Sequence, residues 1–412
     1  MILAHGIGGV AGLPLDGELV LQTGGAVVLV SFLAVALLWK QPRFTGPVTG
    51  RPLPAALDAP GLRTALQAGT LAVAAAVVGY GLAGPQDPDA NPAPRALYVL
   101  AWVGIIPASV LLGPVWRVLN PLRLLHRLVA AALRRPVDGS TPLPVGLGYW
   151  PAAAGLLVFV WLELVAPERD RPAVVAGFLL AYAVLHTAAA LRFGPRWFDR
   201  ADAFEVYSTL AGALAPVGRL DCGRIGLRNP FRGLVAVPVA PGLVGFVALW
   251  WGSTVFDGLT GWVGWAGARQ AVGVPLLLDT AVLAGLVLLV AALYRAATGA
   301  LAGALASTLV PIAAGYTVAH YVTLLLVEGP RGLAQLVAPG ATLGPVTAVP
   351  APVVVAGIQI GAVLAGHVTA VVAAHDRSVA LLPEHRRLAD QVPLVLLMVA
   401  YTMAGLFLLV IS

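Results

Sequence analysis

The chain has 412 residues, of which 59% are hydrophobic and only 11% charged, and its formal net charge is +6. Soluble domains carry about 25% charged residues, and even large ones leave much of their surface in water. The composition therefore excludes a soluble globular protein and a disordered chain, and it predicts that most residues lie in lipid. The single cysteine, Cys222, excludes an internal disulfide framework.

About ten apolar runs are long enough to cross a hydrocarbon layer of about 30 Å. They are rich in Leu, Val, Ala and Gly and lack the alternation of a membrane β-barrel strand. The sequence therefore predicts an all-α, polytopic helical bundle that forms one membrane domain over residues 1–412. The predicted helices cover residues 19–39, 65–84, 96–114, 147–166, 173–192, 234–255, 274–294, 303–327, 352–374 and 392–411. Pro238 and Pro241 are expected to kink or break the sixth.

The basic residues predict the orientation of these helices, because cytoplasmic loops retain Lys and Arg. With both termini outside, the cytoplasmic loops hold twenty of the 25 Lys and Arg residues, and the Arg-rich loop 192–233 alone holds seven. We therefore expect a plasma-membrane protein whose inner face contacts anionic lipid headgroups. Insertion alone accounts for the basic charge, so no nucleic-acid partner is predicted.

Two cytoplasmic segments resemble each other. Gly113-Pro-Val-Trp-Arg-Val-Leu-Asn-Pro-Leu-Arg123 follows the third predicted helix, and Gly194-Pro-Arg-Trp-Phe-Asp-Arg-Ala-Asp-Ala-Phe204 follows the fifth. The similarity predicts a duplicated unit, at about 96–135 and 173–217, in which a membrane helix leads into a surface helix. The segments 117–135 and 203–217 are expected to lie on the inner leaflet.

Ionisable side chains inside the predicted helices identify the candidate site, because each costs about 3 kcal/mol or more at mid-bilayer. They are Glu163, His186, Asp279, His320 and His367. At about 1.5 Å per residue, Glu163, Asp279, His320 and Gln359 fall at similar depth in the outer half. Tyr316 and Tyr321 flank His320 on its helix, Tyr401 lies in the middle of the tenth predicted helix, and His5 lies near the outer surface.

This set of side chains is compatible with three kinds of chemistry. His5, Asp279, His320 and Glu163 could bind a divalent transition metal that activates water, with His320 and Asp279 as the catalytic pair. An Asp–His pair could instead relay protons in a transporter. The same groups could also simply satisfy one another between packed helices.

The histidines of the inner half have simpler explanations. His186 and His367 are expected to form hydrogen bonds across neighbouring helices. His375 and Asp376, at the membrane edge, and His385 are expected to be solvated and charge-paired.

Several segments carry a resemblance to a known family: Ala4-His-Gly-Ile-Gly-Gly9, Asp202-Ala-Phe-Glu-Val-Tyr-Ser208, Arg228-Asn-Pro-Phe-Arg232, Ala319-His-Tyr321, Gly366-His-Val368, Ala374-His-Asp-Arg377 and Tyr401-Thr-Met-Ala-Gly405. In these segments the chain resembles the actinobacterial polytopic membrane proteins commonly labelled fenitrothion hydrolase. The resemblance spans almost the whole chain and departs at Ala203, where a proline is expected.

The resemblance implies a membrane hydrolase of small apolar phosphotriesters, with His320, Asp279 and His5 holding a metal on the outer side. Two other functions remain open: an ion- or proton-coupled transporter or copper-handling membrane factor, and an accessory subunit of a larger membrane complex. Bound metal with ester turnover would indicate the first function. Coupled ion flux would indicate the second, and fixed stoichiometric partners the third.

Overall fold

The computed structural model describes residues 17–340, 350–386 and 388–411 of the chain and is 76% helical. Over these residues, nine segments are long and apolar enough to cross a membrane. One of them, Pro275–Val337, has 63 residues and contains two long helices, α14 and α16, so it crosses twice. The prediction of an all-α polytopic bundle of about ten membrane helices is confirmed.

The membrane helices are separated by short helices and a small sheet. The long ones are α1 (Gly17–Leu38), α2 (Pro60–Ala83), α7 (Trp150–Leu164), α8 (Pro172–Phe193), α12 (Leu243–Thr260), α14 (Pro275–Thr298), α16 (Val310–Val337), α17 (Pro352–Leu381) and α18 (Val392–Ile411). The third span combines α3 (Pro92–Pro94), the π-helix η2 (Arg95–Val103) and α4 (Gly104–Leu112). The short elements are α5 (Val115–Leu119), α6 (Pro121–Ala132), α9 (Arg196–Ala201), α10 (Ala203–Gly212), α11 (Pro230–Val235), α13 (Val263–Val272), α15 (Ala302–Leu305), β1 (Gly50–Pro52), β2 (Val217–Arg219) and β3 (Ile225–Arg228).

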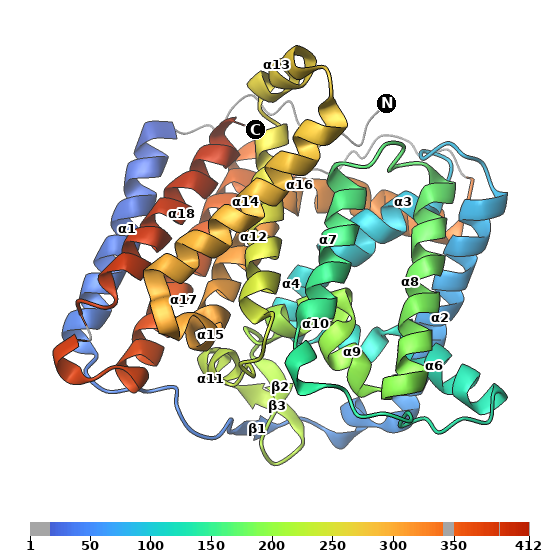
Figure 1. Ribbon diagram of the computed structural model, residues 1–412, viewed down its shortest axis with the longest axis horizontal. Helices are drawn as coiled ribbons and strands as arrows, with labels where there is room; N and C mark the ends of the chain where they lie inside the picture. The colour runs from blue at the N-terminus through green and yellow to red at the C-terminus, as the bar shows by residue number, and fades with distance from the viewer. Residues whose placement is uncertain (1–16, 341–349, 387, 412) are drawn as a thin grey trace.

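Two groups of helices lie side by side (Figure 1). One contains α1, α14, α17 and α18, and the other contains α2, α7, α8 and the span from α3 to α4. The helices α12 and α16 join them, because α12 packs against both α7 and α14, and α16 packs against both α17 and η2.

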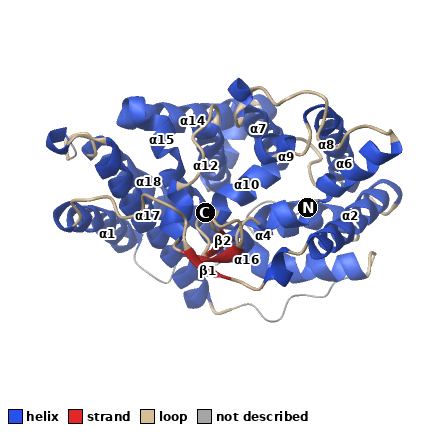
Figure 2. Cartoon of the chain, turned by 90° about the horizontal axis from the view of Figure 1, so that it is seen from below, coloured by secondary structure: helices blue, strands red, loops and turns tan. Residues whose placement is uncertain are grey.

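A three-stranded antiparallel sheet, in the order β1-β3-β2, lies at one end of the bundle (Figure 2). The described part of the chain begins at α1 and ends at α18 on the opposite end (Figure 1). The sheet is built from two of the Arg-rich loops that the sequence analysis assigns to the cytoplasmic side, so these loops lie together at this end of the bundle.

Prolines begin many of the helices. Pro60, Pro172, Pro275 and Pro352 each occupy the first turn of a membrane helix. A first-turn proline fixes φ near the helical value and lacks an N–H that would have no partner there. The sixth predicted helix has a different boundary. Pro241 lies before α12, which begins after the left-handed Gly242 and runs to Thr260, so the predicted span 234–255 is wrong at both ends.

The two segments of similar sequence have matching local structure. Gly113 and Gly194 have φ of +89° and +73°, values that favour glycine, and each ends a membrane helix. Asn120 caps α6 by accepting from the Leu122 N–H, and Asp202 caps α10 by accepting from the Phe204 N–H. The two caps also contact each other, because Asn120 Nδ2 donates to Asp202 Oδ2 over 2.8 Å.

The surroundings of α6 and α10 differ. On α6, Leu128 is more than half exposed, as expected for a helix at the inner leaflet. The prediction that 203–217 is a surface helix is wrong, because nine of the ten residues of α10 are buried. Figure 1 shows α10 among α4, α7 and α9. Its amphipathic pattern therefore reflects contact with protein on both faces.

Candidate functional site

A buried aspartate joins α12 and α16 near the end of the bundle where α12 ends. Asp257 Oδ2 accepts a hydrogen bond from the Tyr321 hydroxyl over 2.6 Å and lies 2.9 Å from His320 Nε2. Only 1% of the Asp257 residue surface is exposed. A carboxylate, an imidazole and a phenol therefore share one site from which water is largely excluded.

Aromatic rings hold the imidazole in place. The Tyr316 ring lies parallel to the His320 ring with centroids 5.8 Å apart, and the Tyr321 ring meets it edge-on at 4.7 Å. Trp251 meets the Tyr316 ring edge-on, with centroids 4.9 Å apart. The Tyr316 hydroxyl is buried, has no hydrogen-bond partner and interacts electrostatically with Asp257.

A second carboxylate belongs to the same site. Glu163, in the last turn of α7, is buried, and its nearest charges include Asp257 and Arg169. Its Oε2 atom has no hydrogen-bond partner. Two buried carboxylates within electrostatic range repel each other, and the repulsion is relieved when one carries a proton.

Asp279 has a different partner from the one predicted. It is buried near the start of α14 and forms an ion pair of 3.1 Å with Arg269 of α13, which is half exposed. The carboxylate hydrogen-bonded to His320 is Asp257 instead. Sequence analysis missed Asp257 because the predicted sixth helix ended at residue 255, two residues before it. A search that allowed for boundary errors of a few residues would have included it.

Glu163, Asp279 and His320, the predicted metal ligands that the structure describes, do not form one ligand group. Within residues 17–340, 350–386 and 388–411, no three His, Cys, Asp or Glu side chains are placed to hold one metal ion. Glu163 and His320 approach the same aspartate, while Asp279 pairs with Arg269. His5 lies outside the described residues. The side chains that the structure describes therefore do not fit a divalent transition metal, which needs at least three protein ligands at a catalytic site.

The other predicted polar residues lie apart from this site. Tyr401 donates to the Val290 carbonyl over 3.3 Å, and Gln359 is partly exposed on α17. His186 does bond a neighbouring helix, since its Nδ1 accepts from Trp197 Nε1 over 3.0 Å. His367 does not, because its Nδ1 bonds the Val363 carbonyl of its own helix at 2.8 Å.

The prediction that His375 and Asp376 are solvated is wrong, because α17 extends to Leu381 and both side chains are buried. Asp376 accepts from Trp39 Nε1 and from the Arg43 and Phe44 N–H groups, which anchors the chain after α1.

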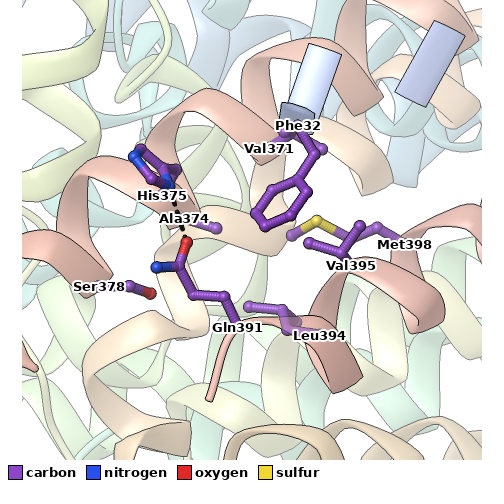
Figure 3. Close-up of a pocket in the computed structure, with 9 residues that line it drawn as sticks. All are labelled: Phe32, Val371, Ala374, His375, Ser378, Gln391, Leu394, Val395 and Met398. Carbon is purple, nitrogen blue, oxygen red and sulfur yellow. Dashed lines mark hydrogen bonds between the residues drawn. The ribbon is translucent and has the colours of Figure 1, made fainter. Parts of the chain in front are cut away.

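A small cavity lies beside His375. Its volume of about 10 Å³ is enough for about one water molecule. Figure 3 shows His375 bonded to Gln391 on one side of it, at 2.8 Å, and Phe32 and Met398 on the other. The cavity is mostly apolar and lies between α1, α17 and α18.

A buried ion pair that sequence analysis missed joins η2 to α16. Arg95 Nε donates to Glu328 Oε2 over 2.7 Å, and the same guanidinium contacts Asp89 and Gln335. The set of candidate residues did not include Glu328 because the predicted helix ended at residue 327, whereas α16 continues to Val337. This cluster holds η2, in one of the two groups of helices, against the connecting helix α16.

Comparison of the chain with models of known protein families, with curated proteins and with solved structures found no match. The resemblance to fenitrothion hydrolases is therefore not supported by these comparisons. Fold and site together define the class: a multi-pass helical membrane protein with a buried carboxylate–histidine–tyrosine site.

Proposed function

We propose that this protein is a proton-coupled transporter of the plasma membrane, in which Asp257, His320 and Glu163 bind the coupling proton. The observation that carries the proposal is the hydrogen-bonded pair of Asp257 and His320, enclosed within membrane helices and joined by Tyr321. Ionisable groups buried at this depth are costly, and proton relays are a common task for them.

The pair lies where proton binding can change the conformation. Asp257 is on α12 and His320 is on α16, the two helices that join the groups in Figure 1. An ionised Asp257 accepts strong, charge-assisted hydrogen bonds from both partners. When Asp257 binds a proton these bonds weaken, and so does the link between α12 and α16. Proton binding is thereby coupled to relative movement of the helices, as transport requires.

The test is a rapid pH step applied to proteoliposomes on a solid-supported membrane. Wild-type protein is expected to give a transient current as protons enter the buried site. Asp257→Asn is expected to reduce this current severalfold or more, because an amide does not titrate. Asp279→Asn is the matched control, since it also replaces a buried aspartate, and it is expected to retain the current. No transient in the wild type, or an equal transient in Asp257→Asn, would contradict the proposal.

Metal-assisted ester hydrolysis is the alternative that the family resemblance implies. It needs a bound metal, and among the described residues the donors do not converge. Elemental analysis of detergent-purified wild type beside His320→Ala distinguishes the two functions. A stoichiometric transition metal that is lost in the variant would favour the hydrolase. Partners that co-purify in fixed ratio would instead favour an accessory subunit.

A further inference from the structure

The amphipathic helix α6 packs on the protein along one side and is exposed along another. Its buried residues Leu122, His126 and Ala130 recur at every fourth position, on the side that meets α2 and α8. By contrast, Leu128 and Leu133 are each more than half exposed. In Figure 1, α6 lies at the same end of the bundle as the sheet and projects outward from α8. An amphipathic helix at the edge of a membrane protein places its exposed apolar side chains on lipid.

The exposed part of α6 ends in two arginines. Arg134 and Arg135 follow Leu133 directly, and both side chains are exposed. Asp138 is exposed in the loop that follows, so the net charge of this end remains positive. The two preceding arginines are held by protein groups, Arg123 by Glu205 and Arg127 by Gln67. Arg134 and Arg135 are therefore the guanidinium groups of this segment that can contact an anion outside the protein.

Arg134 adopts a backbone conformation that usually selects glycine. Its φ is +53°, in the left-handed region, where the Cβ atom of an L-residue is disfavoured. The Arg134 N–H donates to the Ala131 carbonyl over 3.1 Å, and the Arg135 N–H donates to the Ala130 carbonyl over 2.8 Å. These two bonds end α6 in a Schellman motif, in which glycine is the usual residue at the left-handed position.

A strained residue of this kind points to a function that offsets the strain. A basic side chain near the end of a helix also interacts favourably with the helix dipole. Arg135 already supplies such a charge, and its φ is not positive, so the dipole does not require a second arginine at position 134. By contrast, α4 and α8 end at Gly113 and Gly194, which adopt a positive φ without strain. Arginine at position 134 is explained if both guanidinium groups bind the same ligand.

We propose that the end of α6 binds an anionic phospholipid, whose phosphate contacts Arg134 and Arg135 and whose acyl chains lie along Leu128 and Leu133. Guanidinium groups form charge-assisted hydrogen bonds with phosphate oxygens. The exposed leucines favour a lipid over free phosphate, because free phosphate would leave them in water. The two arginines favour an anionic lipid over a zwitterionic one, because they repel the cationic part of a zwitterionic headgroup.

The test measures the thermal unfolding midpoint of the purified protein in neutral detergent, with added phosphatidylglycerol or phosphatidylcholine of the same acyl chains. Phosphatidylglycerol is expected to raise the wild-type midpoint by several degrees more than phosphatidylcholine does, because a ligand that binds the folded state stabilises it. Arg135→Gln is expected to lose about half or more of this difference, because each arginine near a headgroup contributes similarly to the attraction.

Arg134→Gly separates backbone strain from lipid binding. Glycine adopts the left-handed conformation freely, so without added lipid this variant is expected to unfold at a higher temperature than the wild type. It is also expected to lose about half or more of the difference between the two lipids. A gain of stability without lipid together with a weaker response to lipid distinguishes loss of a binding site from general destabilisation.

Two control variants are matched to the two properties of Arg134. Glu168→Gly removes a non-glycine residue with φ of +52° that carries no positive charge. Arg224→Gln removes an exposed arginine from the turn between β2 and β3. Both variants are expected to keep the wild-type difference between phosphatidylglycerol and phosphatidylcholine.

Three results would overturn the proposal. Equal effects of the two lipids on the wild type would show that the headgroup charge is not recognised. A wild-type response to phosphatidylglycerol in either Arg134→Gly or Arg135→Gln would place lipid binding elsewhere. A dimer in native mass spectrometry that Leu128→Asn dissociates would show that a second copy of the chain covers this side of α6 instead.

Discussion

Replacement of Glu328 by alanine is expected to lower the free energy of unfolding by about 3 kcal/mol or more, the range for breaking a buried ion pair. Arg95 and Glu328 are only 5% and 2% exposed, so the variant leaves a guanidinium in the interior without its buried counter-charge. The remaining contacts of Arg95 with Asp89 and Gln335 compensate only in part. Reversible unfolding in mixed micelles measures the change.

Glu168→Ala is the matched control for this prediction. Glu168 also pairs with an arginine, Arg171, at 2.9 Å, but both side chains are more than half exposed. Exposed pairs contribute about 0–1 kcal/mol, so this variant is expected to unfold nearly as the wild type does. Equal effects of the two variants would show that the Arg95 cluster does not fasten η2 to α16.

Replacement of Gly366 by alanine is expected to destabilise the protein by about 1–3 kcal/mol, as overpacking does in tightly packed interiors. A Cβ atom at Gly366 would meet the Pro311 carbonyl oxygen, and one at Gly315 would meet the Ala362 carbonyl oxygen. These contacts are with backbone atoms, so α16 and α17 must move apart to accept the methyl group. The shift of the thermal unfolding midpoint in detergent measures the effect.

Gly361→Ala provides the comparison on the same helix. A Cβ atom at Gly361 would have no neighbour within 4 Å, so the substitution is expected to cause no loss of stability. Alanine also forms helices more readily than glycine does, by about 1 kcal/mol in helix interiors. A loss for Gly361→Ala as large as that for Gly366→Ala would mean that the close approach of α16 and α17 does not limit packing.

The amino-acid sequence by itself determined that this is a helical membrane protein, where most of its helices lie and which end carries the basic residues. These properties depend on local composition: a run of apolar residues must span the hydrocarbon, and arginines stay on the side from which the chain inserts. Helix depth also led to the prediction that Glu163 and His320 lie at similar depth in the membrane.

The tertiary structure decided which polar residues meet. Depth places Asp279 and Asp257 both within reach of His320, but the direction in which a side chain points turns by about 100° per residue along a helix. Both α12 and α16 end later than predicted, so Asp257 and Glu328 lie within these helices and are buried. The burial of α10 likewise depends on the helices packed around it, because the same amphipathic sequence can face lipid or protein. Pairing and burial arise from contacts between distant segments, and such contacts leave no local pattern in the sequence.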